Sequence, residues 1–335
     1  MRVAIGAVAG TTGGPATYAV ELVRALVAEF PSDEWTVITD RPDLFETASD
    51  VIAVPLGSAW GQPWWDHVRA GRWLRRGSFD LYHGTKGVLP WCLPVPGVAT
   101  IHDLAVLHMP ETFHRAQRLH LRLETPHTVR RAAAIITVSR SSATDLVRAY
   151  PRAADKIEVV PEAASPELAP ASDEEIAAWR ERYGATDPAV GYLGTIQPRK
   201  NVDLAAEAFV RAAGDRPWQF LLAGRMRPGY RPACLGWGDE RIRYLGEIPA
   251  EDLPAFFGAL ACMVSPSAYE GFGLTFLEAM AAGCPVIGIA NSSVPEVVGD
   301  AGILVRSADA AELADAIDQV VTDAALAADL SRRGV

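Results

Sequence analysis

Short apolar runs alternate with longer amphipathic stretches along this chain. In the first half the apolar runs predict strands, separated mostly by helical stretches; these strands are Val3–Ile5, Trp35–Ile38, Val51–Val54, Phe79–Tyr82, Val98–Ile101, Ala134–Val138 and Ile157–Val160. The first long amphipathic stretch, Tyr18 to Phe30, predicts a helix. Strands that alternate with helices are typical of a parallel, doubly wound sheet.

The same pattern starts again in the second half. Residues 161–170 are rich in Pro, Ala and Glu and predict a linker, and residues 173–183 predict a helix. Further strands are predicted at Val190–Leu193, Phe220–Ala223, Ile242–Leu245, Cys262–Val264 and Val286–Ile289. We therefore expect an α/β protein with two Rossmann-like, doubly wound domains facing across a cleft. Residues 1–163 form the first domain, 164–185 the linker and connecting helix, and 186–335 the second domain.

Length and composition agree with this picture. A chain of 335 residues with 49% hydrophobic and 21% charged residues suits two globular domains of about 150 residues each. Its apolar runs fall far short of the roughly 20 residues that span a bilayer. The four cysteines show no C-x-x-C spacing, so we expect reduced thiols in a cytoplasmic protein, without a disulfide framework or a metal site.

The charge is unevenly distributed. The formal net charge of -10 argues against a nucleic-acid partner. Residues 64–131 nevertheless hold ten Lys and Arg against five Asp and Glu, together with all seven histidines. Such a region could contact anionic lipid, as a peripheral protein on the inner face of a membrane, or a phosphorylated acceptor. The alternative is a pair of solvated helix faces.

The run from Glu270 to Met280 carries the strongest chemical signal. Its glycines, Gly271 and Gly273, predict a loop that opens directly into a helix from Leu274 to Ala282, and Gly283 stands where a glycine commonly ends a helix. A glycine turn before a helix N-terminus presents backbone N–H groups and the positive end of the helix dipole. That combination suits a phosphate or diphosphate.

Two carboxylates bracket this run. Glu278 shares a helical stripe with Leu274 and Ala282, so an unpaired charge there would be costly and a ribose diol is one candidate partner. Glu270 precedes the helix and is expected at its mouth, near whatever is attached to the phosphates. The alternatives are that Glu278 faces solvent and that Glu270 is a capping acid.

The segment resembles the E-x7-E signature of retaining glycosyltransferases of the GT-B fold, family 4 type. The resemblance covers nearly the whole chain and extends through Gly283–Ile287, Pro295–Val298 and Gly299–Val305. It implies that Glu270 is catalytic, either by stabilising positive charge on the sugar ring or as a transient nucleophile, and that Glu278 binds ribose. It also implies that the backbone of Gly271, Phe272, Gly273 and Leu274 binds the donor phosphates.

Gly194 to Asn201 resembles the basic donor-phosphate motif of the same family. The sequence has no D-x-D motif that would hold a metal, so Arg199 or Lys200 is expected to stabilise the leaving diphosphate, with no metal or other cofactor required. The family often has arginine directly after the glycine, where this chain has Thr195. Which of the two cations binds phosphate therefore stays open, and a surface basic pair is the alternative.

In the first half, the resemblance places a loop containing Gly13 and Gly14 near the donor phosphates and the acceptor. A dinucleotide-binding turn is the rival interpretation, with Asp40 as the ribose acid, but the spacing is not G-x-G-x-x-G. Trp60, Trp64 and Trp65 could stack on an acceptor sugar or belong to the core.

Polar residues at strand ends complete the candidate site. Thr100–Leu104 resembles the family's T-x-H-D-L segment, which implies that His102 is catalytic or contacts the sugars and that Asp103 lies on the acceptor side. His83 and Lys86 form a similar cluster. A histidine that only satisfies loop backbone is the alternative for His102.

The resemblance implies a retaining glycosyltransferase that moves a mannose- or glucose-type sugar from a nucleotide-diphospho-sugar to a glycan, glycolipid or small-molecule hydroxyl by front-face attack. Another GT-B activity, such as an epimerase or a phosphorylase, is a further alternative. A non-catalytic sugar-nucleotide or lipid-binding protein is the alternative from a different class. Members of the family usually continue into a further helix, so we expect that the sequence is truncated at Val335.

Overall fold

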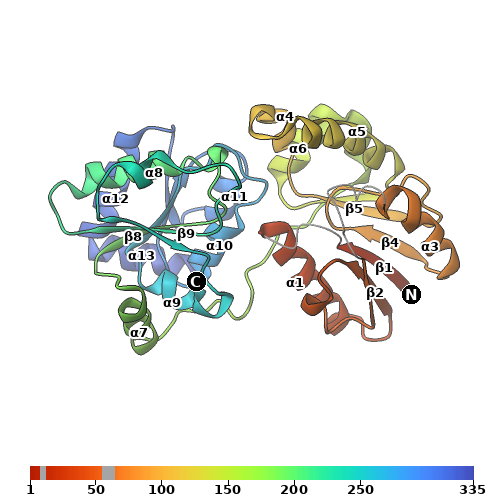
Figure 1. Cartoon of the computed structure of the whole chain (residues 1–335), viewed down its shortest axis with the longest axis horizontal. Coiled ribbons are helices and arrows are strands. Elements are labelled where there is room, and N and C mark those ends of the chain that lie inside the picture. Colours follow the sequence, from red (N-terminus) through yellow and green to blue (C-terminus); the bar gives the residue numbers. More distant parts are fainter. Residues whose placement is uncertain (8–12, 55–64) are drawn as a thin grey trace. The chain divides into compact units, whose positions relative to one another are not determined.

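The computed structural model describes residues 1–7, 13–54 and 65–335 (Figure 1). These residues form two compact units, Met1–Glu162 and Ala163–Val335. Each unit is a parallel sheet with helices on its faces.

The described part of the first unit contains a seven-stranded sheet in the order β3-β2-β1-β4-β5-β6-β7. Its strands are β1 (Arg2–Ala7), β2 (Glu34–Thr39), β3 (Asp50–Ala53), β4 (Leu81–Gly84), β5 (Gly97–Ile101), β6 (Ala134–Thr137) and β7 (Ile157–Val159). Its helices are α1 (Gly14–Glu29), α3 (Ala70–Arg76), α4 (Ala105–His108), α5 (Arg115–Arg131) and α6 (Arg140–Ala149), with a π-turn at Trp65–Arg69. The strand order reverses at β1 and β4, which are neighbours.

The second unit has a six-stranded parallel sheet in the order β10-β9-β8-β11-β12-β13. Its strands are β8 (Ala189–Leu193), β9 (Gln219–Ala223), β10 (Ile242–Gly246), β11 (Cys262–Ser265), β12 (Val286–Ile289) and β13 (Gly302–Val305). Its helices are α7 (Asp173–Tyr183), α8 (Val202–Ala213), α9 (Leu253–Gly258), α10 (Leu274–Ala281), α11 (Val294–Val298), α12 (Ala310–Thr322) and α13 (Ala324–Gly334), and a 3-10 turn covers Pro198–Lys200.

Two apolar clusters enclose the second sheet. On one face, Phe209 of α8 stacks on Phe220 of β9 with ring centroids 5.4 Å apart, and α12 adds Ile317. On the other face, Phe276 of α10 and Phe256 of α9 belong to a separate cluster. Strands buried on both faces explain why the sequence shows continuous apolar runs and not alternation.

The predicted α/β fold with two Rossmann-like sheets is confirmed. The helix predicted at residues 173–183 is α7, and its N-terminus carries a capping box between Ser172 and Glu175. Strand β13 was not among the predicted strands. It is an edge strand with three half-buried residues, Gly302 to Leu304, and therefore has a weak apolar signal.

The sheet order of the second unit positions its loops. The chain runs outward from β8 to β10 and then returns to place β11 on the other side of β8. At such a reversal the loops that follow the two central strands diverge and leave a crevice at the carboxyl ends. The loops after β8 and β9 also approach closely, because a Cβ at Gly224 would lie 2.1 Å from the carbonyl oxygen of Gly194.

Candidate functional site

Helix α10 begins and ends at glycines. Gly273, with φ of 102°, immediately precedes Leu274, the first helical residue. At the other end Gly283 has φ of 77°, its N–H donates to the carbonyl of Met280, and the N–H of Cys284 donates to that of Ala279. This pair of bonds is a Schellman motif. The predicted glycine loop, helix start and glycine stop are therefore present in the structure.

A buried ion cluster lies beside this loop. Nζ of Lys200 donates to Oε1 of Glu270, and the NH1 group of Arg199 lies 3.5 Å from Oε2 of the same carboxylate. Lys200 is 9% exposed and Glu270 is 6% exposed. The two cations follow β8 and the acid follows β11, so the sheet order brings together residues 70 positions apart.

Hydrogen bonds to backbone carbonyls hold the same two loops together. Arg199 donates from NH1 to the carbonyl of Tyr269 at 2.6 Å, and its own carbonyl accepts from the N–H of Ala268 at 2.9 Å. Asn201, in a left-handed conformation, donates from its amide to the carbonyl of Pro266 at 3.0 Å. The ion cluster therefore does not depend on side chains alone for its position.

Two serines that the sequence analysis missed fix the glycine loop from a third element. Ser292 Oγ accepts from the N–H of Glu270 at 2.9 Å, and Ser293 Oγ lies 3.0 Å from the Glu270 carbonyl and 2.7 Å from that of Phe272. Both serines follow β12. The signal that could have found them is a polar pair directly after a buried strand of the same sheet.

The electrostatics of Glu270 combine two opposing effects. Burial raises the pKa of a carboxyl group, whereas Lys200, Arg199 and hydrogen bonds from Lys200 and Ser267 lower it, and the net pKa of Glu270 is lowered. The carboxylate is therefore ionised at neutral pH. The cluster then holds two positive charges against one negative charge, which favours an anionic ligand nearby.

Glu278 lies in the second turn of α10. Its side chain is half-buried, as is that of Leu274, while Ala282 is buried. The stripe predicted from the sequence thus lies at the edge of the core, where a carboxylate is tolerated. Because Glu278 belongs to the helix that Gly273 starts, its distance from the glycine loop is set by helix geometry.

In the first unit, His102 follows β5 and is held from several sides. Its Nε2 donates to the carbonyl of Thr85 at 2.8 Å, and Nδ1 lies 3.4 Å from Oε1 of Glu162, an ion pair when the ring is protonated. The ring of Tyr18 meets the His102 ring edge-on, with centroids 4.8 Å apart. Glu162 is a further residue that the sequence analysis missed, since its only signal is a polar residue soon after β7.

His83, predicted on the acceptor side, is instead part of the interior. Its Nε2 pairs with Thr100 Oγ1 at 2.8 Å, and that hydroxyl also pairs with the Tyr18 hydroxyl at 2.9 Å. Burial, and secondarily the charge of His102, lowers the pKa of His83 to about 4. Whether it also contacts an acceptor stays a prediction; its ring bonds to the buried Thr100 hydroxyl, and burial keeps the ring neutral.

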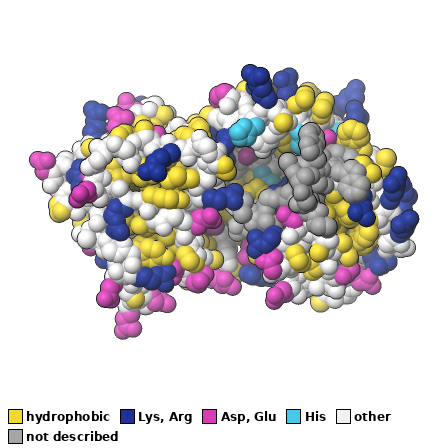
Figure 2. Space-filling model, viewed as in Figure 1, with side chains coloured by type: hydrophobic (Ala, Val, Ile, Leu, Met, Phe, Trp, Pro, Cys, Tyr) yellow, Lys and Arg dark blue, Asp and Glu magenta, His cyan; other side chains and the backbone are white. Residues whose placement is uncertain are grey.

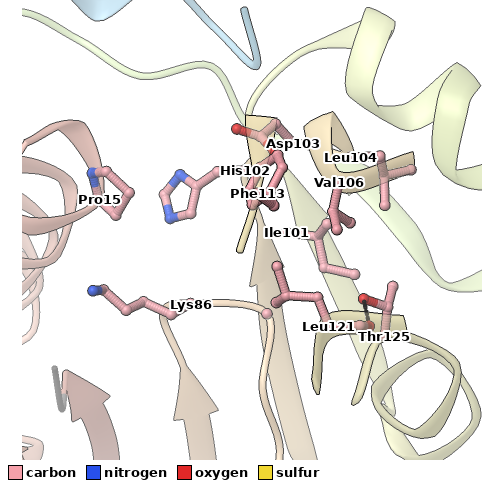
Figure 3. Close-up of a pocket in the computed structure, with 11 residues that line it drawn as sticks. Pro15, Lys86, Ile101, His102, Asp103, Leu104, Val106, Phe113, Leu121 and Thr125 are labelled. Carbon is pink, nitrogen blue, oxygen red and sulfur yellow. Dashed lines mark hydrogen bonds between the residues drawn. The ribbon is translucent and has the colours of Figure 1, made fainter. Parts of the chain in front are cut away.

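Lys86, His102 and Asp103 line one cavity of about 230 Å³ (Figure 3). Asp103 Oδ1 accepts from the N–H of Ala105 at 2.9 Å and so begins α4. Pro15, at the start of α1, lies on the same side of the view as Lys86 and His102.

The remaining predicted residues are placed as follows. Gly13, with φ of 84°, is the exposed cap of α1 and accepts from the N–H of Ala16, while Gly14 is half-buried. The rest of the predicted glycine turn, residues 10–12, lies outside the described residues, as do Trp60 and Trp64. Trp65 is 7% exposed and packs in the apolar core of the first unit, which decides between the two alternatives for that residue.

Comparison with known proteins places this chain in a family. Residues 12–168 match the profile described as Glycosyltransferase Family 4, and residues 187–323 match that of Glycosyl transferases group 1. The O-antigen chain mannosyltransferase B of Escherichia coli is 34% identical over 273 residues, which are 77% of this chain and 69% of the relative. The chain belongs to glycosyltransferase family 4.

Other family 4 relatives act on different compounds. A 2-deoxystreptamine glucosyltransferase of Streptomyces kanamyceticus is 31% identical, with 69% of this chain and 62% of the relative aligned. A D-inositol 3-phosphate glycosyltransferase of Stackebrandtia nassauensis is 32% identical, with 74% and 61% aligned. The alignment therefore spans between three fifths and seven tenths of the length of these relatives.

Solved structures show the same fold. HepE of Anabaena in complex with UDP and glucose superposes with a TM-score of 0.81 at 20% identity, covering 100% of this family 4 chain and 93% of HepE. WaaG, a glycosyltransferase involved in lipopolysaccharide biosynthesis, gives 0.78 at 17% identity, with 99% and 94% covered. The GT-B architecture is thus confirmed. Among the described helices of this chain, none has the length and apolar character needed to cross a bilayer.

The buried ion cluster predicts a strong energetic coupling between Lys200 and Glu270. Lys200→Ala should destabilise the second unit by roughly 3–5 kcal/mol, because it removes the closest partner of a buried carboxylate. Glu270→Gln should also destabilise it, by leaving two cations without their shared partner. In urea titrations the double variant should lose less stability than the sum of the single losses, and simple additivity would contradict the coupling.

His83 predicts a pH dependence of stability. Its folded pKa of about 4 lies below the unfolded value of 6.5, so the unfolded chain binds a proton that the folded chain does not. The contribution of His83 to the free energy of unfolding is fully present above pH 6.5. It falls by about 3 kcal/mol as the pH drops to 4. Urea titrations at pH 7 and pH 4 should show that His83→Gln removes this part of the loss.

The exposed His114→Gln serves as the control for His83 and should leave the pH dependence as in the wild type. If His83→Gln loses as much stability between pH 7 and pH 4 as the wild type does, the buried ring is not the cause of that loss.

Proposed function

We propose that this family 4 chain transfers a sugar from a nucleotide-diphospho-sugar to an acceptor hydroxyl and retains the anomeric configuration. The observation that carries the proposal is the buried cluster of Glu270, Lys200 and Arg199 beside the glycine loop and N-terminus of α10. One excess positive charge and the N-terminus of a helix together make a site for a diphosphate. The names of the relatives favour a mannose- or glucose-type sugar and a glycan, glycolipid or small-molecule acceptor.

In the proposed mechanism the donor diphosphate competes with Glu270 for its cations. As Lys200 and Arg199 turn part of their charge to the phosphates, the carboxylate is released to face the sugar, where positive charge develops on the ring. The amides of Gly271 to Leu274 bind the phosphate oxygens, and Glu278 binds the ribose diol. The acceptor hydroxyl attacks on the face that the leaving group departs from, and a phosphate oxygen takes its proton.

The same charges support a reaction that needs no metal or other cofactor. Two fixed cations and the helix N-terminus supply the stabilisation that a divalent ion gives a leaving diphosphate elsewhere. In the first unit, His102 is proposed to contact the reacting sugars, with its ring oriented by the Thr85 carbonyl and by Glu162.

Two carboxylate variants test this proposal. Glu270→Gln should lower the turnover of slow donor hydrolysis by at least about a hundredfold, because a transition-state charge loses its partner. Glu278→Ala should raise KM for the donor about tenfold and change turnover little, since a ribose hydrogen bond acts on ground state and transition state alike. The measurement is hydrolysis of UDP-, GDP-, ADP- and dTDP-sugars, each with and without EDTA.

Glu207→Ala, an exposed acid on α8, is the matched control and should behave as the wild type. Wild-type rates in both carboxylate variants would contradict the assignment of the site. A complete loss of hydrolysis with EDTA would contradict the metal-free mechanism alone.

We also propose that the basic region of the first unit contacts an anionic membrane surface. On α5, Arg115, Leu119, Arg122 and Leu123 form one exposed stripe in which both leucines are more than 60% exposed. Figure 2 shows basic and hydrophobic side chains next to one another over this part of the unit. Exposed arginines are attracted to an anionic surface, and exposed leucines beside them add apolar area that an interface can bury.

Sedimentation with vesicles containing phosphatidylglycerol measures this contact. Arg122→Gln should weaken binding about fivefold, because each arginine near an anionic surface contributes about 1 kcal/mol. Arg211→Gln, the same change at an exposed position of α8 in the second unit, should leave binding unchanged. Equal binding of the wild type to neutral and anionic vesicles would refute a charge-driven contact.

A further inference from the structure

The cavity of the first unit has two chemically different sides. Figure 3 shows Pro15, His102 and Lys86 on one side and Ile101, Leu121 and Thr125 on the other. Leu104, Val106 and Phe113 extend the apolar lining. The first side holds His102, which the proposed function assigns to the reacting sugars, and Lys86, which the sequence analysis predicts on the acceptor side, so the apolar side is adjacent to the place where chemistry is expected.

The apolar side is poorly suited to a sugar ring. Its polar side chains are those of Asp103 and Thr125, and both make local bonds: Asp103 Oδ1 accepts from the N–H of Ala105 at 2.9 Å, and the Thr125 hydroxyl donates to the carbonyl of Leu121 at 2.8 Å. Leu121 and Thr125 lie four residues apart on α5, so one stripe of this helix lines the cavity while the Leu119 and Leu123 stripe is exposed. Sugar hydroxyls placed against this lining would lose their water partners and find few replacements, which is costly.

We propose that this cavity binds an alkyl aglycone of the acceptor, next to the hydroxyl that receives the sugar. Its volume of about 230 Å³ has room for roughly seven or eight groups of about 30 Å³, the volume of one water molecule and close to that of a methylene. A short alkyl chain fills this space without unsatisfied polar atoms. That the ligand is an acceptor rests on the proposed function. That the cavity prefers an apolar group follows from its lining alone.

Direct binding of alkyl glycosides tests the inference. The probes are methyl, butyl, hexyl and octyl α-D-mannoside, each below its micellar concentration, and Kd is measured by calorimetry with the full chain. Each added methylene that enters the cavity should lower Kd about fourfold. The gain should level off once the space is filled. A Kd that is independent of chain length would overturn the inference.

Two leucine variants distinguish the cavity from unspecific adsorption of a detergent. Leu121→Ala removes part of the lining and should weaken octyl mannoside binding at least fivefold while leaving methyl mannoside binding unchanged. Leu123→Ala changes an exposed leucine two residues away on the same helix and should have no effect. Equal losses in the two variants would place the alkyl chain outside the cavity and overturn the inference.

Transfer assays with the same probes separate this inference from the proposed function. A chain-length dependence of Kd without sugar transfer would support the apolar cavity and count against the proposed function. Transfer to methyl and octyl mannoside with equal KM and equal Kd would support the proposed function and overturn the inference.

Discussion

The carboxylate of Glu270 is buried with two cations, and the arrangement of the second unit's site depends on that contact. A charge at 6% exposure is tolerated only where partners compensate for lost hydration. Lys200 and Arg199 supply this compensation from the loop after β8, and Ser267 supplies a hydrogen bond from the loop after β11. Without the three charged side chains, the backbone bond from Ala268 to the Arg199 carbonyl and the hydrogen bond of the Asn201 side-chain amide would still join these two loops.

This cluster also explains how an anion-binding site can be pre-organised in the absence of its ligand. Two cations close together repel each other, and a carboxylate between them lowers that cost. The net charge of the group stays positive, so the cluster would attract the diphosphate of the proposed donor. The serines after β12 hold the backbone of Glu270 and Phe272, so the charges can be shared without rearranging the loop.

The first unit has the same sheet architecture as the second but carries a cavity with a largely apolar lining. Its cavity begins at the end of β5, where His102 leaves the strand, and is closed by α4 and α5. Polar groups on its lining are largely committed to local bonds, such as Asp103 to the start of α4 and Thr125 to its own helix. What remains for a ligand is an apolar volume beside a small number of polar atoms, which is how small-molecule sites usually combine affinity with orientation.

The sequence by itself determined the sheet class, most strands, the glycine loop with its helix, and Glu270 and the basic pair as a candidate site. Those features follow from local patterns: apolar runs, capping residues and glycines whose backbone geometry other residues avoid. Only the tertiary structure decided that Lys200 pairs with Glu270, that Ser292 and Ser293 hold the loop, that Glu162 faces His102 and that His83 is interior. These relations join residues distant along the chain, and the order of strands in the sheet brings them together, which no local pattern encodes.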